Sequence, residues 1–591
     1  MKVGISKRQL HKRQHQVEAL GLQAESLAER HFFKRLDRLV PVRRFVITWV
    51  LLFVLLSGCL IGQIRALDGH FRSLAPVPGG IYTEGILGDF TTANPIYASG
   101  EVDESVSKLL FASLLKYDEH NQLAGDMAES WAIDESERVY TVKLRPNLLW
   151  HDGASLTSRD VLFTYQMIQN PDASSFLQAS WRDIKVAALD DRTVTFTLPN
   201  PLSAFPHHLT NGIIPEHLLK DTAPTELRSA TFNTLNPVGS GPFMWQKVEV
   251  SGETPETREE QIALTPFKNY HEGEPKLASF VIHSFHDSGR LAKSFERREL
   301  TAASFPELPQ AVKGHDGILV NDFMLTAANM VFFKQTNPLF ADAAVRKALV
   351  QAADVEAIIR ELDYPTHPVK GPFLIGQLGY DKTLVQPPVN REAAAASLDA
   401  AGWLKGENGL RAKAGVPLGF ILQAQDTPEN RVITAKLQED WEQIGVKADM
   451  QLRDGSDLQQ TISEQNYDAL LYGISIGTDP DVFVYWHSSQ KDARSNRLNF
   501  SMYGSKVADA ALEGGRTRND PTLRAVKYRP FLQAWQQDTP ALGLYQPRYM
   551  YATHGTVFGL SPRTINSDVE RFNTVHNWQI RQASVINTQE R

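Results

Sequence analysis

A continuous apolar run near the N-terminus stands out in the hydropathy pattern of this chain. Residues Phe45–Ile64 contain no charged side chain, whereas Arg43, Arg44 and Arg65 flank them. These twenty residues are enough to cross a bilayer as an α-helix. The pattern therefore predicts a membrane anchor at 45–64, with a short head at 1–44 and a large body behind it.

Beyond the anchor, segments with the period of β-strands alternate with segments that have the period of α-helices. Residues 139–144 and 193–198 place apolar side chains at every second position, as half-buried strands do. Thr157 and Asp160 have the spacing of a capping box, which begins a helix. The same reasoning predicts helices over residues 157–170, 345–352, 354–362, 392–401 and 433–444. Strands alternating with helices predict an α/β body, and its length favours two lobes.

Charge is distributed unevenly on the two sides of the anchor. The head holds eleven Lys or Arg and four Asp or Glu, a net charge of +7, and the rest of the chain carries −14. Basic flanks stay on the cytoplasmic side of a membrane. We therefore expect a single-pass membrane protein with the head in the cytoplasm and the body in the extracellular or periplasmic space. An acidic external body also argues against nucleic acid as a partner.

Cys59 is the only cysteine of the chain, and it leaves two modes of anchoring open. Leu56–Cys59 match the small-residue pattern that precedes a lipid-modified cysteine in bacterial lipoproteins. A removable signal has a short basic region, however, and this head has 44 residues. We expect an uncleaved anchor, and a lipoprotein held through Cys59 is the alternative. A lone cysteine also excludes an intramolecular disulfide.

The chain offers little that would support catalysis. It lacks the GxSxG, HExxH and glycine-rich phosphate-binding motifs. His207–His208 and Glu216–His217 could ligate a metal, but no third ligand follows at a suitable spacing. We therefore expect a protein that is not an enzyme and that uses no metal or other cofactor.

Seven short motifs follow one another along the body. They include GGIYTEGILGDFTTANP from Gly79, NPVGSGPFMW from Asn236 and YDALLYGISIGTDPDVFVYWHSSQ from Tyr467. The others lie within residues 123–161, 344–359, 393–403 and 540–552. In this order they resemble the extracellular solute-binding proteins of family 5, the peptide-binding components of ABC importers. The resemblance covers residues 78–577, nearly the entire body.

The resemblance implies a two-lobed periplasmic-binding-protein-like fold (type II, large peptide-binding class) with a ligand cleft between the lobes. The implied division is a linker at 65–77, lobe one at 78–333, lobe two at 334–539, a return to lobe one at 540–577 and a tail at 578–591. The implied function is capture of peptides or a related solute and delivery to the permease subunits of an ABC importer, by a monomer. The alternative is a membrane-anchored peptide receptor that signals through its cytoplasmic head.

The resemblance also points to residues at the cleft. It implies ligand contact at a first strand, Thr83, Glu84, Gly85 and Ile86, and at a cleft strand, Tyr472, Gly473, Ile474, Ser475, Ile476 and Gly477. Many family members carry an acidic residue directly after the cleft strand, where it pairs with the α-amino group of the peptide. Gly477 holds that position here, and Asp479 comes two residues later. We expect Asp479 to be the nearest electrostatic contributor, or else the turn residue of an Asp-Pro step.

Overall fold

The computed structural model describes residues 26, 42–254, 257–362, 366–491 and 498–586. The chain forms two compact units. One unit comprises the chain up to Pro76 together with the residues from Gln582 onward, and the other spans Val77–Arg581. The head expected at 1–44 lies almost entirely outside the described residues.

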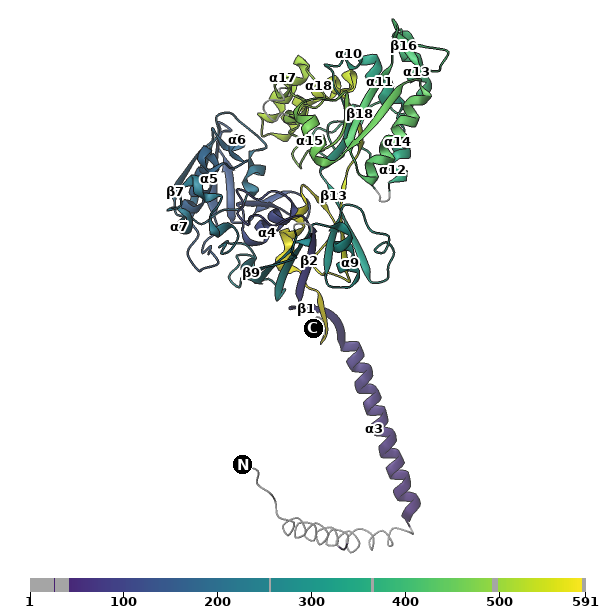
Figure 1. The fold of residues 1–591 in the computed structure, drawn as a ribbon. Helices are drawn as coiled ribbons and strands as arrows, with labels where there is room; N and C mark the ends of the chain where they lie inside the picture. The colour runs from purple at the N-terminus through teal and green to yellow at the C-terminus, as the bar shows by residue number, and fades with distance from the viewer. Residues whose placement is uncertain (1–25, 27–41, 255–256, 363–365, 492–497, 587–591) are drawn as a thin grey trace. The chain divides into compact units, whose positions relative to one another are not determined.

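The apolar run lies within one long helix of the first unit, α3 (Arg43–Phe71) (Figure 1). Residues 44–65 of this helix are long and apolar enough to cross a membrane, by length and composition, and none of their most apolar window is buried. Thr48 satisfies its hydroxyl inside the helix, because it donates to the carbonyl of Arg44 at 2.7 Å. The predicted anchor segment is therefore a continuous exposed helix.

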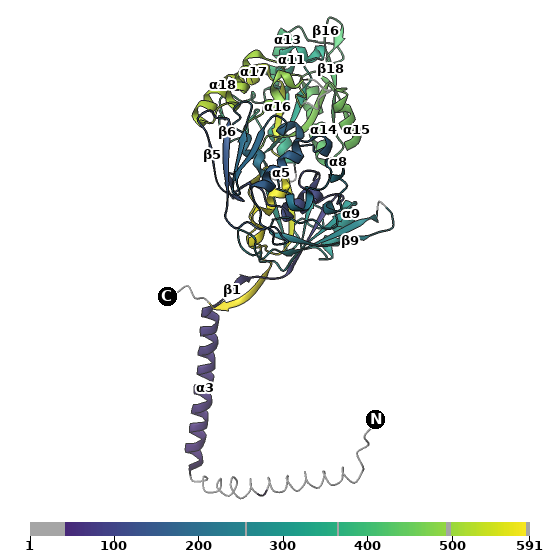
Figure 2. The ribbon, with the colours of Figure 1, turned by 90° about the vertical axis from the view of Figure 1, so that its left-hand side faces the viewer.

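A two-stranded sheet follows this helix. Strand β1 (Arg72–Val77) pairs with β24 (Arg581–Ile586), the last strand of the chain (Figure 2). The structure thus has helix and strand where the sequence suggested a linker at 65–77, and a paired strand within the tail expected at 578–591. The sequence could not indicate this pairing, since its two strands are separated by the whole body.

An eight-stranded mixed sheet forms the base of lobe one. Its strands lie in the order β23 (Thr564–Ile565), β13 (Ile318–Leu325), β22 (Arg548–His554), β12 (Ala302–Phe305), β2 (Ile81–Leu87), β11 (Ser279–Phe285), β10 (Glu259–Pro266) and β9 (Phe243–Ser251). Strand β2 runs parallel to both of its neighbours, β11 and β12. A strand paired on both edges lies inside its sheet, so β2 is a core element.

The second sheet of lobe one is antiparallel and has the order β5 (Ala128–Ile133), β6 (Val139–Leu144), β8 (Thr193–Thr197) and β7 (Lys185–Asp190). It confirms the strands predicted at 139–144 and 193–198. Helix α5 (Ser158–Gln169) packs on it, and its capping box of Thr157 and Asp160 is formed as predicted. The remaining elements of this lobe are α4 (Glu101–Leu110), β3 (Leu115–Tyr117), β4 (Leu123–Gly125), η3 (Pro171–Ala173), α6 (Gln178–Trp181), η4 (Phe205–Thr210), α7 (Glu216–Leu219), α8 (Pro224–Leu227), η5 (Thr231–Asn233), α9 (Ser288–Glu296) and η9 (Asp568–Asn577).

Lobe two is built on a five-stranded sheet in the order β19 (Lys447–Arg453), β18 (Gly419–Gln425), β20 (Ala469–Ser475), β14 (Ala327–Phe333) and β21 (Ala541–Tyr545). Its helices are α10 (Pro338–Ala341), α11 (Ala343–Ala352), α12 (Val355–Glu361), α13 (Arg391–Ala400), α14 (Pro428–Gln443), α15 (Gly455–Ser463), α16 (Phe483–Trp486), η7 (Ser488–Gln490), α17 (Lys506–Arg516) and α18 (Pro521–Asp538). A small sheet of β15 (Leu404–Lys405), β16 (Arg411–Lys413) and β17 (Val416–Pro417) completes it. The helices predicted near 345–352, 354–362, 392–401 and 433–444 are confirmed.

The chain crosses between the lobes at two short segments. Strands β14 and β21 both pair in the sheet of lobe two, so the crossings fall at residues 325–327 and 545–548. The sequence placed them at 333/334 and 539/540 instead. Both strands have successive apolar positions that face the two different cores of lobe two: Val331 and Met330 in β14, and Leu542 and Ala541 in β21. Such a pattern shows that a strand is central, but it does not show in which sheet.

Candidate functional site: the cleft strand and the interlobe cavity

The edge of strand β20 provides unpaired backbone at the boundary of the lobes. Strand β14 pairs with β20 along its whole length, from Ala469 to Ser475. Strand β18, on the other side, pairs only with Ala469 and Leu470. Among the residues that the structure describes, no strand pairs with this second edge of β20 between Leu471 and Ser475.

The direction of the backbone groups in β20 follows from one hydrogen bond. The Ile476 amide donates to the carbonyl of Thr326 at 2.9 Å, on the side of β14. Backbone groups of an antiparallel strand point alternately to its two edges. Ile474 and Tyr472 therefore bond to β14, whereas Leu471, Gly473 and Ser475 point their N–H and C=O groups to the other edge. The hydroxyl of Tyr485 confirms this direction for Ser475, because it donates to the Ser475 carbonyl at 2.7 Å.

The side chains of the same strand alternate between core and surface. Ile474 and Ile476 are buried, Tyr472 and Gly477 are half-buried, and Gly473 and Ser475 are exposed. The free edge thus carries the two most exposed residues of the predicted cleft strand. A peptide in extended conformation could pair with this edge through main-chain hydrogen bonds.

Beyond the strand, the chain makes contact with lobe one. The Thr478 hydroxyl donates to Oδ1 of Asn566 at 2.8 Å and lies 3.4 Å from the carbonyl of Asn121. Gly477 has a φ of +80°, which favours glycine over any residue with a side chain. The side-chain amide of Gln377 donates a hydrogen bond to the Gly477 carbonyl at 2.7 Å. The end of the cleft strand is therefore fixed against both lobes.

The carboxylate of Asp479, beyond the end of this strand, is already paired with an arginine. Its two carboxylate oxygens accept hydrogen bonds from Nη1 and Nη2 of Arg524, both at 2.7 Å, and His207 Nε2 lies 4.0 Å away. Burial by itself would lower the pKa of Arg524, but the hydrogen bonds and charge of Asp479 raise that pKa above its ordinary value. A ligand amine at Asp479 would have to compete with this bidentate pair.

Thr83, Glu84, Gly85 and Ile86 lie in β2, inside the sheet of lobe one. Glu84 and Ile86 are fully buried. Thr83 is engaged through both backbone groups, since its amide lies 3.2 Å from the Thr301 hydroxyl and its carbonyl accepts from the Thr301 amide at 2.7 Å. This first strand is thus an interior strand of its sheet, and ligand contact at its residues stays a prediction. The motif matched the sequence of the strand but could not show that both of its edges are paired.

A buried ion pair accounts for the acidic residue of β2. Glu84 accepts hydrogen bonds from Nε and Nη2 of Arg571 at 2.9 and 2.6 Å and from the Tyr551 hydroxyl at 2.6 Å. Burial raises the pKa of Glu84, and the positive charge of Arg571 opposes this shift. The ion pair of Glu84 therefore connects η9 to the eight-stranded sheet, and the role of Glu84 is structural.

A cavity of about 370 Å³ separates the two lobes near the crossings. Lobe one contributes Glu307, Lys313 and Met550 to its lining, and lobe two contributes Leu362, Thr427 and Glu429. Thr427 caps helix α14 by accepting a hydrogen bond from the Asn430 amide at 3.1 Å. Glu429 accepts a hydrogen bond from the Tyr545 hydroxyl at 2.5 Å. These residues were not predicted from the sequence. The only local signal near them is the Thr427-Pro428 step, which is typical of a helix start rather than of a cleft.

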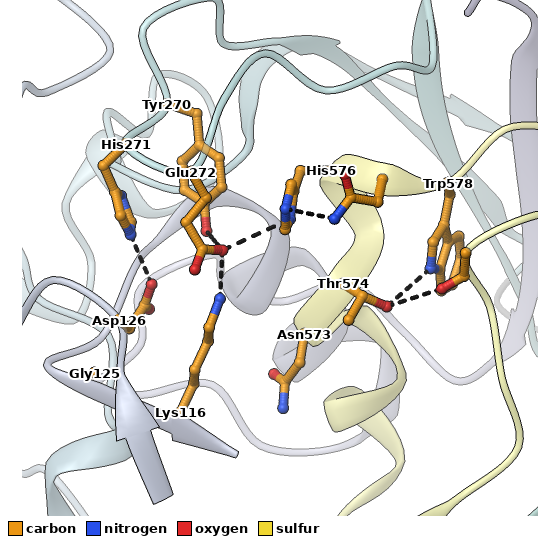
Figure 3. A network of polar contacts seen from close by, with 12 residues as sticks. Lys116, Gly125, Asp126, Tyr270, His271, Glu272, Asn573, Thr574, His576 and Trp578 are labelled. Atoms are coloured by element: carbon orange, nitrogen blue, oxygen red, sulfur yellow. Dashed lines mark hydrogen bonds and ion pairs between the residues drawn. The ribbon is translucent and has the colours of Figure 1, made fainter. Parts of the chain in front are cut away.

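A polar network in lobe one gathers possible metal ligands (Figure 3). Asp126, His271 and Glu272 bring ligand atoms within 4.8 Å of one another. His271 Nε2 lies 2.9 Å from Asp126 Oδ1, however, and the ammonium of Lys116 forms an ion pair with Glu272. A metal ion would have to displace this ammonium. The network is satisfied as a set of internal ion pairs, and it carries no argument for a metal. His207–His208 and Glu216–His217 lie apart from it, on η4 and α7.

The model of the bacterial extracellular solute-binding proteins, family 5 (middle part), matches residues 122–496. The chain belongs to this family. Family 5 proteins bind solutes and are not enzymes, so the chain is a solute-binding protein with the two-lobed α/β fold described above.

Among curated proteins, this family 5 protein is similar to the oligopeptide-binding protein AppA of Bacillus subtilis. The two are 26% identical over 511 residues, which cover 84% of this chain and 92% of AppA. It is also similar to the probable D,D-dipeptide-binding periplasmic protein DdpA of Escherichia coli, with 23% identity over 526 residues that cover 85% of this chain and 95% of DdpA.

Solved structures confirm the fold. NikZ from Campylobacter jejuni in complex with Ni(L-His) matches with a TM-score of 0.71 and 25% identity, over 85% of this chain and 99% of NikZ. AppA from Bacillus subtilis in complex with a nonapeptide matches with a TM-score of 0.68 and 24% identity, over 86% of this chain and all of AppA. Both the peptide-bound and the nickel-chelate-bound relatives therefore share the architecture of this family 5 chain.

Proposed function

We propose that this protein is a membrane-tethered extracellular solute-binding protein that captures peptides, or a related solute, between its lobes and delivers them to an ABC importer. The observation that carries the proposal is the free edge of β20, which lacks a strand partner between Leu471 and Ser475 among the described residues. The groups of this edge without a partner among the described residues are the N–H and C=O of Gly473 and the N–H of Ser475, since the Ser475 carbonyl accepts from the Tyr485 hydroxyl. Backbone pairing is indifferent to side-chain identity, so it suits a protein that binds many peptides.

The cavity between the lobes supports the same proposal. Its volume of about 370 Å³ is in the range of small-ligand sites, and both lobes line it. A ligand that contacts both lobes favours their closure by differential binding to the closed state. The named ligands of similar proteins, an oligopeptide and a D,D-dipeptide, are in keeping with a peptide ligand here.

Helix α3 is the basis for the proposed tether. Its residues 44–65 have the length and hydropathy of a membrane span, and the +7 head precedes them. We infer an uncleaved single pass with the body outside the cytoplasm, where an importer would receive its ligand. Permease subunits of an ABC importer are the partners of such a protein, and it would act as a monomer.

One pair of variants tests strand addition. Ser475→Pro removes an N–H that points to the free edge and leaves the hydrogen bonds to β14 in place. Ser475→Ala is the matched control, because it keeps that N–H and changes an exposed side chain. Peptides that co-purify with the full chain are identified by mass spectrometry and used in calorimetric titrations. We expect Ser475→Pro to weaken binding by about tenfold, the cost of one to two hydrogen bonds. Unchanged affinity in a folded Ser475→Pro variant would exclude pairing at this edge.

A further inference from the structure

A second cavity, of about 210 Å³, lies in lobe one. Glu104, Ser107 and Lys108 of helix α4 form one side of it, and Phe176, Thr210 and Val569 contribute to the rest. Phe176 is 55% exposed at this place. A cavity that combines aromatic and polar walls has the composition of a side-chain pocket for a ligand.

Glu104 is the acidic group of this cavity. Among the residues that the structure describes, no basic side chain forms an ion pair with its carboxylate. Burial, and after it the charges of Asp568, Asp103 and Glu101, together raise the pKa of Glu104 to about 7. Its ionised form is therefore poorly compensated, and a positive charge brought into the cavity would stabilise it.

Two basic side chains, one on α4 itself and one on η9, form no ion pair with Glu104 among the described residues. Lys108 lies one helical turn after Glu104 and lines the same cavity, and burial lowers its pKa while the charges of Asp126, Glu570 and Glu272 oppose this shift. Arg571 donates to Glu84 at 2.6 and 2.9 Å. Within the described residues, the Glu104 carboxylate on the wall of this cavity thus has no ion-pair partner, although Lys108 belongs to the same wall.

A short series of residues connects the wall of this cavity with the end of the cleft strand. Val569 on its wall is three residues after Asn566, whose amide oxygen accepts a hydrogen bond from the Thr478 hydroxyl at 2.8 Å. Thr478 in turn directly follows Gly477, which ends the cleft strand. A ligand paired along the free edge of β20 would therefore bring one of its ends close to this cavity.

We propose that this cavity receives a positively charged group of the bound peptide and that Glu104 is the counter-ion. The group is an ammonium or guanidinium, from either the free amino terminus or a basic side chain. This inference rests on the proposed peptide binding and adds the class of peptide. Glu104 would then supply the carboxylate for a positively charged ligand group. Gly477 has no side chain for this, and the Asp479 carboxylate is paired with Arg524.

The test uses synthetic peptides of five alanines with an amidated carboxyl end. One peptide is N-acetylated and uncharged, and a second has a free amino terminus. A third set is N-acetylated and carries one lysine at each position in turn. The full chain in lipid nanodiscs is titrated with each peptide by calorimetry, as wild type, as Glu104→Gln and as Glu296→Gln. The last variant is the control, because Glu296 is exposed on α9 in the same lobe.

We expect Glu104→Gln to weaken binding of charged peptides by about tenfold, the loss expected for an ion pair in a partly desolvated site. Binding of the uncharged peptide should not change, and neither should any affinity of Glu296→Gln. A loss confined to the free-amine peptide would assign the group to the amino terminus, and a loss confined to a lysine peptide would assign it to a side chain.

Two other outcomes would overturn the inference. If the wild type binds charged and uncharged peptides equally, or Glu104→Gln weakens all of them alike, Glu104 is not a counter-ion, although peptide binding itself would stand. If no peptide of the set binds to the wild type, peptide binding fails and this inference fails with it.

Discussion

Asp479 and Arg524 form a bidentate ion pair in which both oxygen–nitrogen distances are 2.7 Å. The two side chains are only 11% and 7% exposed, and the pair ties the loop after β20 to helix α18. Many relatives of this family are expected to use an acid near this place for the peptide amine. Here Asp479 is paired with Arg524 of the same lobe, so the main contribution of Asp479 is to the stability of the loop after β20.

Replacing Asp479 with asparagine should therefore lower stability more than it alters selectivity. The change leaves the buried guanidinium of Arg524 without its counter-charge, which costs about 3 kcal/mol in comparable buried pairs. Thermal and denaturant unfolding of Asp479→Asn measure this loss, with Glu296→Gln as the surface control. Free-amine and N-acetylated peptides should lose affinity equally. A loss limited to free-amine peptides, at wild-type stability, would restore Asp479 as an amine ligand.

Replacing Cys59 with alanine should leave both membrane attachment and apparent mass unchanged. Cys59 lies well inside the continuous helix α3, and its side chain is exposed. The helix itself is long enough to hold the protein in a bilayer. Fractionation of membranes followed by intact-mass measurement checks this expectation. Release of the body, or a change of mass relative to the wild type, would favour the lipoprotein alternative.

Local sequence patterns predicted the elements of this fold well, and their long-range pairing poorly. Thr157 and Asp160 specify the start of α5 because the capping interactions lie within four residues. The partner of Asp479 is 45 residues away, and the pair forms only after α18 has packed against the loop. Nothing in either segment identifies the other. The free edge of β20 could likewise not be predicted from the sequence, because it depends on the residue at which β18 stops pairing with β20.

Stability should depend on pH through Glu104. Its pKa is raised from the ordinary 4.5 to about 7, chiefly by burial and then by the charges of Asp568 on η9 and of Asp103 and Glu101 on α4. A carboxyl whose pKa is higher in the folded state binds its proton more tightly there. Its stabilising contribution is therefore complete below pH 4.5 and is lost as the pH rises to about 7. Melting temperatures over this range should decline less in Glu104→Gln than in the wild type. Parallel curves for the two proteins would contradict the assignment.

Asn566 should restrain the lobes in the absence of ligand. Its amide oxygen accepts hydrogen bonds from the Thr326 hydroxyl at 2.7 Å, in a crossing segment, and from the Thr478 hydroxyl at 2.8 Å, after the cleft strand. Its amide nitrogen donates to Oδ1 of Asn121 at 2.8 Å. One side chain thus connects lobe one, a crossing and lobe two.

Asn566→Ala removes all of these hydrogen bonds at once, at a cost of about 1 kcal/mol for each. We expect a wider distribution of distances between the lobes in the ligand-free protein. Spin labels at Glu296 and Glu442, both exposed and one in each lobe, measure that distribution in a Cys59→Ser background. Asn577→Ala, an exposed asparagine elsewhere in lobe one, is the control. Because a ligand that contacts both lobes would restore the restraint, the excess width should disappear when a co-purifying peptide is added. An unchanged distribution in Asn566→Ala would show that the two crossing segments alone set the position of the lobes.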